Sequence, residues 1–299
     1  MKQQLKGTVA LLVATIIWGS AFIAQSVGMD LIGPFTFQSI RSFMAIAFLI
    51  PATLLFDLGK KDGETWISRW CNKKLWTSGA VCGVALFIAA GFQQVGLVYT
   101  SASKAGFITA MYIVLVPFLG LFFKNKPPIT AWISVVIAVI GLYMLSCVGV
   151  SEINIGDILL LGCAMTYSVQ ITLIDRLAPG LDGIRLTCVQ LIFCMLCSIP
   201  FMIGEKPVLA NITACFLPLA YAGVMSMGIA YTLQIVGQQY LPPTPASLLM
   251  SLESVFAALC GWLILHETLT AYELFGCGLV FAAVIISQLP VRTKNNANA

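Results

Sequence analysis

FQQVGLVYTSASKAGF, residues 92–107, and LQIVGQQYLPPTPASL, residues 233–248, are two copies of one hydrophobic pattern. At a shift of 141 residues, the distance from Phe92 to Leu233, the copies share Gln93/Gln234, Val95/Val236, Gly96/Gly237, Tyr99/Tyr240 and Ala105/Ala246. Earlier segments align at a shift of 149 residues, which pairs Trp18 with Tyr167. Such duplication in an apolar chain is typical of secondary transporters, because two repeats of opposite topology supply an outward-open and an inward-open packing.

The composition is that of a membrane protein. Of the 299 residues, 59% are hydrophobic and 9% are charged, and the mean hydropathy is +0.95. A membrane-spanning helix needs about 20 apolar residues. Ten segments qualify: 6–27, 34–56, 75–97, 102–123, 129–149, 156–174, 182–203, 213–239, 244–265 and 271–290. We therefore expect an all-α membrane protein with ten transmembrane helices, and a retained first helix in place of a cleaved signal peptide.

The basic residues predict the orientation. With a cytoplasmic N-terminus, thirteen of the sixteen lie on the inner side: Lys2, Lys6, Lys60, Lys61, Arg69, Lys73, Lys74, Lys124, Lys126, Arg176, Arg185, Arg292 and Lys294. The outer side holds Lys104 and Lys206, and Arg41 lies inside a span. The positive-inside rule then places both termini in the cytoplasm. Five spans precede the second repeat, so the five-helix repeats, 1–150 and 151–290, are inverted, and 291–299 form a cytoplasmic tail.

Local motifs mark helix starts and close packing. Thr270-x-x-Glu273 and Asn154-x-x-Asp157 are arranged as capping boxes, and Gly79-x-x-x-Gly83 favours close helix approach. The ten cysteines contain no CxxC pair, so we expect neither a disulfide framework nor a metal site. No cofactor is expected, and the net charge of +4 reflects the loop bias rather than nucleic-acid binding.

Three stretches carry a family resemblance. The Trp18-Gly19 pair, VYTSASKAGFITAMYIVLVP (Val98 to Pro117) and SLESVFAALCGWLILHETLT (Ser251 to Thr270) closely resemble the drug/metabolite transporter superfamily, in its ten-helix branch of two EamA domains. One departure is Ser254, where the family often has proline, so a kink there lacks its usual cause. The resemblance implies a carrier of small metabolites in a bacterial cytoplasmic membrane, often an exporter. It also implies a central cavity lined mainly by the first, third, fourth, sixth, eighth and ninth helices.

Polar residues inside the spans are candidates for lining that cavity. The sixth span carries a polar stripe at helical spacing that includes Tyr167 and Gln170, and the eighth repeats it with Tyr231 and Gln234. Gln93 and Tyr112 add polar groups in the third and fourth spans. Any one of these side chains could simply hydrogen-bond a neighbouring helix, at about 0.6 kcal/mol per contact. Together they favour a polar, substrate-binding interior.

Glu253 is the sharpest candidate, because it lies about ten residues into its span, near the bilayer midplane. An acidic group at that depth costs about 2.5–3.5 kcal/mol, so it is usually functional or paired. Proton coupling, binding of a substrate ammonium and a neutral hydrogen-bonding role all stay open. Its counterpart at the 141-residue shift is Tyr112.

Three further residues have both a functional and a structural interpretation. Arg41 and Lys104 could attract an anionic substrate group, or extend to the outer interface as anchors. Trp18, near the middle of the first helix, is expected to stack on a flat or apolar substrate group.

We therefore expect a secondary transporter that moves a small amino-acid-like or drug-like molecule, as an exporter working by alternating access. A flippase for a lipid-linked group is the alternative. A membrane enzyme is disfavoured because the one histidine, His266, ends a span and no Walker loop is present. The expected partners are the substrate and the bilayer, with either a monomer or a homodimer.

Overall fold

The computed structural model describes residues 2–58, 63–100, 102–123, 127–146, 154–264 and 269–288. His266, the tail 291–299 and Lys60 and Lys61 lie outside these ranges. Within them the chain is helical and forms no β-strand. The helices are α1 (Lys2–Met29), α2 (Pro34–Asp57), α3 (Trp66–Trp70), α4 (Lys73–Tyr99), α5 (Ala102–Ala110), α6 (Tyr112–Phe122), α7 (Ile129–Ser146), α8 (Ile155–Leu177), α9 (Gly183–Gly204), α10 (Leu209–Ala214), α11 (Phe216–Ala220), the π-helix η1 (Tyr221–Ala230), α12 (Tyr231–Gln238), α13 (Pro243–Met250), α14 (Leu252–Ile264) and α15 (Ala271–Gln288).

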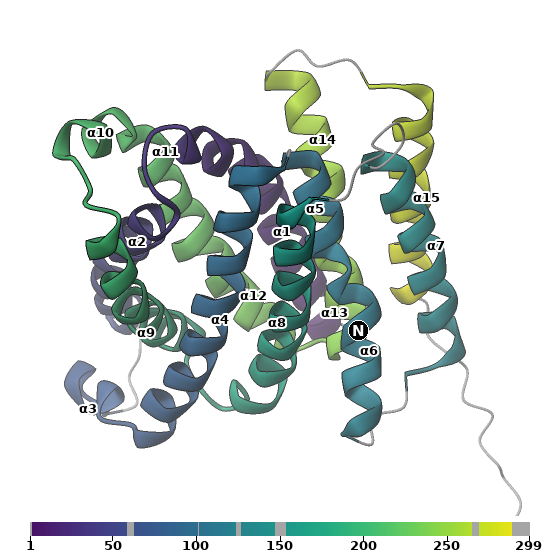
Figure 1. Ribbon diagram of the computed structural model, residues 1–299. Coiled ribbons are helices and arrows are strands. Elements are labelled where there is room, and N and C mark those ends of the chain that lie inside the picture. Colours follow the sequence, from purple (N-terminus) through teal and green to yellow (C-terminus); the bar gives the residue numbers. More distant parts are fainter. Residues whose placement is uncertain are drawn as a thin grey trace, which may run out of the picture.

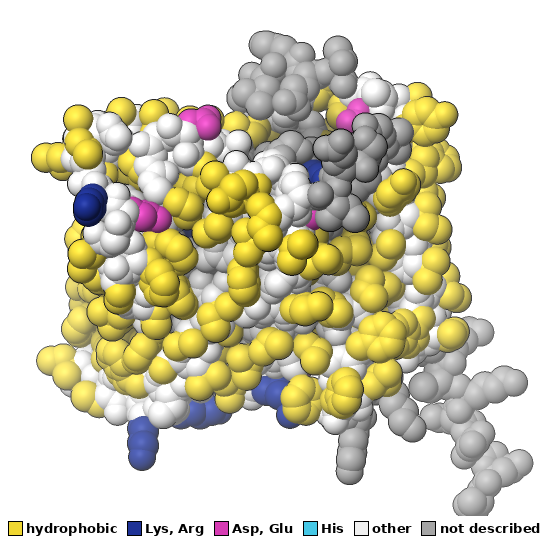
Figure 2. Space-filling view, viewed as in Figure 1, with side chains coloured by type: hydrophobic (Ala, Val, Ile, Leu, Met, Phe, Trp, Pro, Cys, Tyr) yellow, Lys and Arg dark blue, Asp and Glu magenta, His cyan; other side chains and the backbone are white. Residues whose placement is uncertain are grey.

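The predicted ten-helix membrane architecture is confirmed. In the described ranges, nine helical stretches are long and apolar enough to cross a membrane, and the shorter apolar helix Ile129–Leu145 supplies the tenth. Hydrophobic side chains cover most of the face seen in Figure 2, and most of the visible Lys and Arg side chains gather along one edge of that face. This distribution is the one expected of a chain whose apolar surface faces lipid.

The most extensive helix contacts join the first half of the chain to the second. α2 packs on α9, at the left of Figure 1, and α7 packs on α15, at the right. α1 packs on α14 in the ninth span. α8, the repeat counterpart of α1, packs on α5 and α6 in the fourth span, the repeat counterpart of the ninth. Gly79 and Gly83, predicted to allow close approach, lie where α4 contacts Val189 and Gln190 of α9. The halves therefore interlock rather than sit as separate domains.

The α2–α9 pair is fastened at both ends by carboxylates. At one end Asp57, the last residue of α2, forms an ion pair with Arg185 in the first turn of α9. At the other end Glu205, which follows α9, accepts hydrogen bonds from the backbone N–H groups of Phe35 and Thr36 at 2.9 and 2.7 Å. Each helix thus ends on an acid that binds the start of its partner, where the helix dipole also favours a negative charge.

Two spans are interrupted at corresponding places. The fourth breaks at Met111, between α5 and α6, and the ninth breaks at Ser251, between α13 and α14. No proline follows Glu253, yet the second break is present. There the Ser251 hydroxyl donates to the Leu248 carbonyl at 2.8 Å, and the Ser254 hydroxyl donates to Gly106 of α5 at 3.1 Å. Serine hydroxyls that bond to carbonyls can bend a helix without proline.

The remaining local features are the two predicted capping boxes and the connection between α2 and α4. Both capping boxes are present, because Asn154 and Asp157 exchange hydrogen bonds, as do Thr270 and Glu273. The connection between α2 and α4 contains the short helix α3. The indole of Trp66 in α3 donates to Thr53 at 2.9 Å, which holds this segment against α2.

Candidate substrate site

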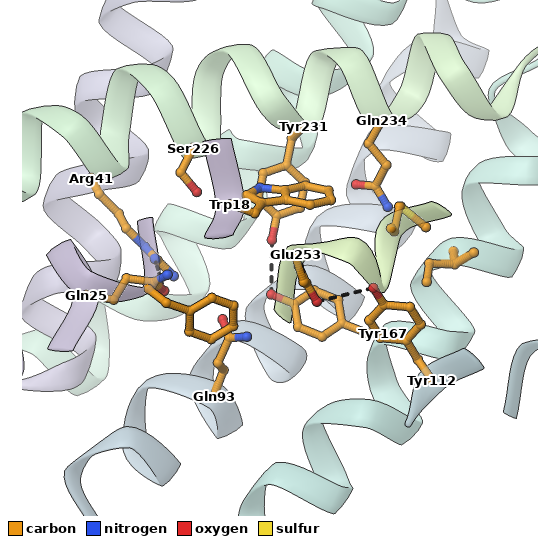
Figure 3. Close-up of a pocket in the computed structure, with 13 residues that line it drawn as sticks. Trp18, Gln25, Arg41, Gln93, Tyr112, Tyr167, Ser226, Tyr231, Gln234 and Glu253 are labelled. Atoms are coloured by element: carbon orange, nitrogen blue, oxygen red, sulfur yellow. Dashed lines mark hydrogen bonds between the residues drawn. The ribbon is translucent and has the colours of Figure 1, made fainter. Parts of the chain in front are cut away.

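A cavity lies between the two halves of the chain, and water-sized molecules can occupy about 40 Å³ of it. The first half supplies α1, α2, α4 and α6, and the second supplies α8, η1, α12, α13 and α14. The lining residues are Trp18, Phe22, Gln25, Arg41, Gln93, Tyr112, Tyr167, Ile171, Ser226, Tyr231, Gln234, Met250 and Glu253 (Figure 3).

The middle of the cavity is aromatic. Trp18 packs edge-on against Tyr231, with ring centroids 5.1 Å apart. The hydroxyls of Tyr231 and Tyr167 lie 3.0 Å from each other and share a hydrogen bond. The indole nitrogen of Trp18 is buried without a hydrogen-bond partner. This cluster offers apolar ring surface together with one unused donor.

Glu253 enters the cavity from the first turn of α14, directly after the break at Ser251. The Tyr112 hydroxyl, from the first turn of α6, donates to its carboxylate at 3.2 Å. These two residues are repeat counterparts, so each broken helix contributes one partner of the bond. α14 is brought close to α1 at Gly19, where an added Cβ would lie 2.8 Å from the Glu253 carbonyl oxygen. The helix breaks and this close approach together place the carboxylate in the cavity.

Arg41 enters the same cavity from α2 and is 2% exposed. It does not extend to the outer interface. Its Nη1 donates to Gln25 Oε1 at 2.7 Å, while its Nε has no hydrogen-bond partner. The guanidinium also lies 5.4 Å from the ring centre of Phe37.

Of the remaining predicted residues, some line the cavity and some lie outside its lining. Gln93 and Gln234 line the cavity, whereas Gln170 lies outside the lining and accepts a hydrogen bond from Gln234 at 3.4 Å. Lys104 is also outside the lining, and its Nζ lies 2.6 Å from Asp157 Oδ2. This geometry favours a structural ion pair for Lys104 over capture of an anion.

Several lining residues were missed by sequence reasoning. Gln25 lies near the end of its span, where an amide looks like an interface residue, and Ser226 lies in η1, whose π geometry changes which side chains share a face. Phe22, Ile171 and Met250 look like ordinary apolar positions. Phe22 and Gln25 lie at i+4 and i+7 from Trp18, on the same face of α1. Helical spacing from Trp18 could therefore have identified both residues.

Comparison with known proteins identifies the family. The model of the EamA-like transporter family matches residues 5–147 and 154–289. The chain belongs to this family. It is therefore a transporter of the drug/metabolite transporter superfamily and a multi-pass membrane protein, as the resemblance implied.

Individual relatives agree with this assignment. An uncharacterized transporter of Archaeoglobus fulgidus is 32% identical over 97% of this chain and 88% of the relative. The threonine/homoserine exporter RhtA of Escherichia coli K12 is 31% identical over 59% of this chain and 60% of RhtA. A solved crystal structure matches with a TM-score of 0.76 at 16% identity, over 94% of this chain and 96% of that one. The last likeness concerns the fold alone.

Proposed function

We propose that this transporter exports a small metabolite, amino-acid-like or drug-like, across the cytoplasmic membrane of a bacterium. It works as a secondary transporter by alternating access, and its two halves are inverted repeats with both termini in the cytoplasm. The observation that carries the proposal is the cavity between the halves, to which each repeat brings equivalent residues. Trp18 and Tyr167 are one such pair, and Gln93 and Gln234 are another. Sites at a repeat interface, built partly from broken helices, are typical of such carriers.

Substrate binding is assigned to the residues in and around this cavity. Trp18, Tyr167 and Tyr231 offer ring surface, Gln93 and Gln234 offer amides, and Tyr112 and Glu253 form a hydrogen-bonded acidic group. Gln170 supports Gln234 from outside the lining. The name of the Escherichia coli relative supports export and makes threonine and homoserine the first solutes to test.

The test is solute flux compared with lipid movement in the same vesicles. Purified protein in lipid vesicles is expected to exchange labelled solute faster than empty vesicles, without moving a fluorescent lipid between leaflets. Lipid movement without solute exchange would support a flippase and contradict the proposal.

The direction of transport is tested in membrane vesicles of the two orientations. Export predicts that everted vesicles accumulate the labelled solute when energised, while right-side-out vesicles do not. Accumulation only in right-side-out vesicles would establish an importer.

A further inference from the structure

Equivalent glycine contacts join helices on two sides of the cavity. One contact joins α4 to α8, where a Cβ added at Gly96 would lie 3.3 Å from the Gly156 carbonyl oxygen. The other joins α12 to α1, where a Cβ added at Gly237 would lie 3.1 Å from the Gly7 carbonyl oxygen. Gly237 is the repeat counterpart of Gly96, and Gly7 is that of Gly156. Inverted repeats would place these two matching contacts at opposite faces of the membrane.

Each contact lies one helical turn from a cavity amide. Gly96 follows Gln93 by three residues on α4, and Gly237 follows Gln234 by three residues on α12. Figure 3 shows the two amides on opposite sides of the cavity. The glycine contacts are therefore placed where the two gates of an alternating-access carrier have to open.

An ion pair reinforces the contact between α4 and α8. Lys104 of α5 and Asp157 of α8 are 9% and 5% exposed, and Lys104 Nζ lies 2.6 Å from Asp157 Oδ2. Asp157 directly follows Gly156, the glycine of the contact. Next to it, Asn154 Nδ2 donates to the Tyr99 carbonyl at the end of α4, at 3.1 Å. These polar contacts connect the start of α8 to both α5 and α4.

The counterpart positions at the other contact carry no charge. The counterparts of Asn154, Asp157 and Lys104 are Leu5, Thr8 and Pro245. The leucine side chain has no hydrogen-bonding group, and the proline has no N–H to donate. Two gates that share their glycine contacts therefore differ in the polar contacts that reinforce one of them.

We infer that Lys104 and Asp157 are positioning residues that hold the outer gate shut and bias the empty carrier to open toward the cytoplasm. The inference rests on the proposed function, because it takes the cavity as the transport site and the contact between α4 and α8 as the outer gate. Opening that gate requires the buried ion pair to separate, which is costly until water reaches both charges. Such a bias suits an exporter, since the empty carrier then opens on the side from which it collects its solute.

The test measures from which side a thiol in the empty cavity reacts. Gln93→Cys, in a background without native cysteines, is treated with a small membrane-impermeant thiol reagent in everted and in right-side-out vesicles. Labelling is expected to be about 10-fold faster in everted vesicles, whose cytoplasmic face is outside. Lys104→Met removes the charge and keeps a long side chain. It is expected to shift the ratio of the two rates by about 10-fold toward the outer side.

Further variants separate a gate from a merely structural ion pair. Asp157→Asn keeps an oxygen that can cap α8 and should shift the ratio in the same direction. The double variant should shift it no further than the larger single shift, because the two charges act as a pair. Lys206→Met, which removes an exposed cation beyond α9, is the matched control and should leave the ratio unchanged. Loss of thermal stability in both single variants, with an unchanged ratio, would overturn the inference.

The reporter variant alone decides the question if a charge variant fails to fold. Labelling of Gln93→Cys that is equal from the two sides, or faster from the outer side, would overturn the gate bias and leave the proposed function standing. Inertness from both sides would overturn both, because no gate would then open onto the cavity. A failure to find any transported solute, with labelling faster from the cytoplasmic side, would count against the proposed function alone.

Discussion

At the scale of single residues, Glu253 is the group whose replacement is most informative. Glutamine keeps the shape and can still bond Tyr112, but it carries no negative charge. If Glu253 binds an ammonium, Glu253→Gln should weaken substrate binding and exchange alike, by about 10- to 100-fold. The measurement is solute exchange in vesicles, with and without an imposed pH difference.

Two other outcomes would contradict that role. Normal exchange with loss of pH-driven accumulation would make Glu253 a proton-coupling group, since a carboxyl near the midplane can carry a proton between the two sides. Normal behaviour in both assays would make it a structural hydrogen-bonding residue.

Gly19 tests whether α14 must lie against α1 to place Glu253. An added Cβ at Gly19 would be 2.6 Å from Phe256 Cβ, so Gly19→Ala should force the helices apart and destabilise the protein by about 1–3 kcal/mol. Gly278→Ala is the matched control, because an added Cβ there meets no atom within 4 Å. Thermal unfolding in detergent compares them, and equal stability of the two variants would show that the close approach is dispensable.

The cavity residues show how far the sequence alone can predict a site. Polar spacing and the repeat register selected Trp18, Tyr167 and Gln234, because polar groups in a span are unusual and repeat counterparts meet at one interface. The same reasoning left Arg41 and Lys104 indistinguishable. Which of two cations faces a cavity depends on the partner that each finds, and Asp157 of a distant helix was visible in the sequence only as a cap.

At the scale of helices, the α2–α9 pair is predicted to depend on its ion pairs. Asp57 forms ion pairs with two arginines. One is Arg185, whose side chain is 2% exposed, and the other is Arg69, whose Nε lies 3.6 Å from Asp57 Oδ2. Asp57→Asn should destabilise the protein by about 2–5 kcal/mol, because it leaves a buried guanidinium with less counter-charge. Glu64→Gln is the control: Glu64 lies 3.7 Å from the same Arg69 but is 61% exposed, so its loss should cost about 0–1 kcal/mol. Similar unfolding temperatures for the two variants would contradict the claim that the Asp57 ion pairs stabilise the packing of α2 on α9.

Helix boundaries were predictable where they follow composition, and helix breaks were not. The length of the apolar segments predicted all ten membrane-spanning helices, and the caps at Asn154 and Thr270 follow from residue type and spacing. At the break at Ser251, serine hydroxyls donate to carbonyls, one of them on α5, and a contact with another helix cannot be read from the local sequence. The π-helix η1 likewise has no residue pattern that distinguishes it from an α-helix.

At the scale of the whole molecule, the distribution of basic residues predicts the topology. Reporter fusions or cysteine labelling should place both termini and the Lys60 to Lys74 loop in the cytoplasm, and the Ser151 to Asn154 loop outside. The reason is that thirteen of the sixteen Lys and Arg residues fall on one side of the ten spans. Termini on opposite sides would remove the inverted-repeat arrangement.

The most direct test of transport through the cavity is the reactivity of a cysteine placed in it. Gln93→Cys and Gln234→Cys, each in a background without native cysteines, put a thiol at repeat-equivalent lining positions. Alternating access predicts that a small membrane-impermeant thiol reagent labels each variant from either side of the membrane, and that an exchanged solute slows the labelling. Inertness from both sides, in protein that still transports, would show that the cavity is a packing feature and that the substrate takes another path.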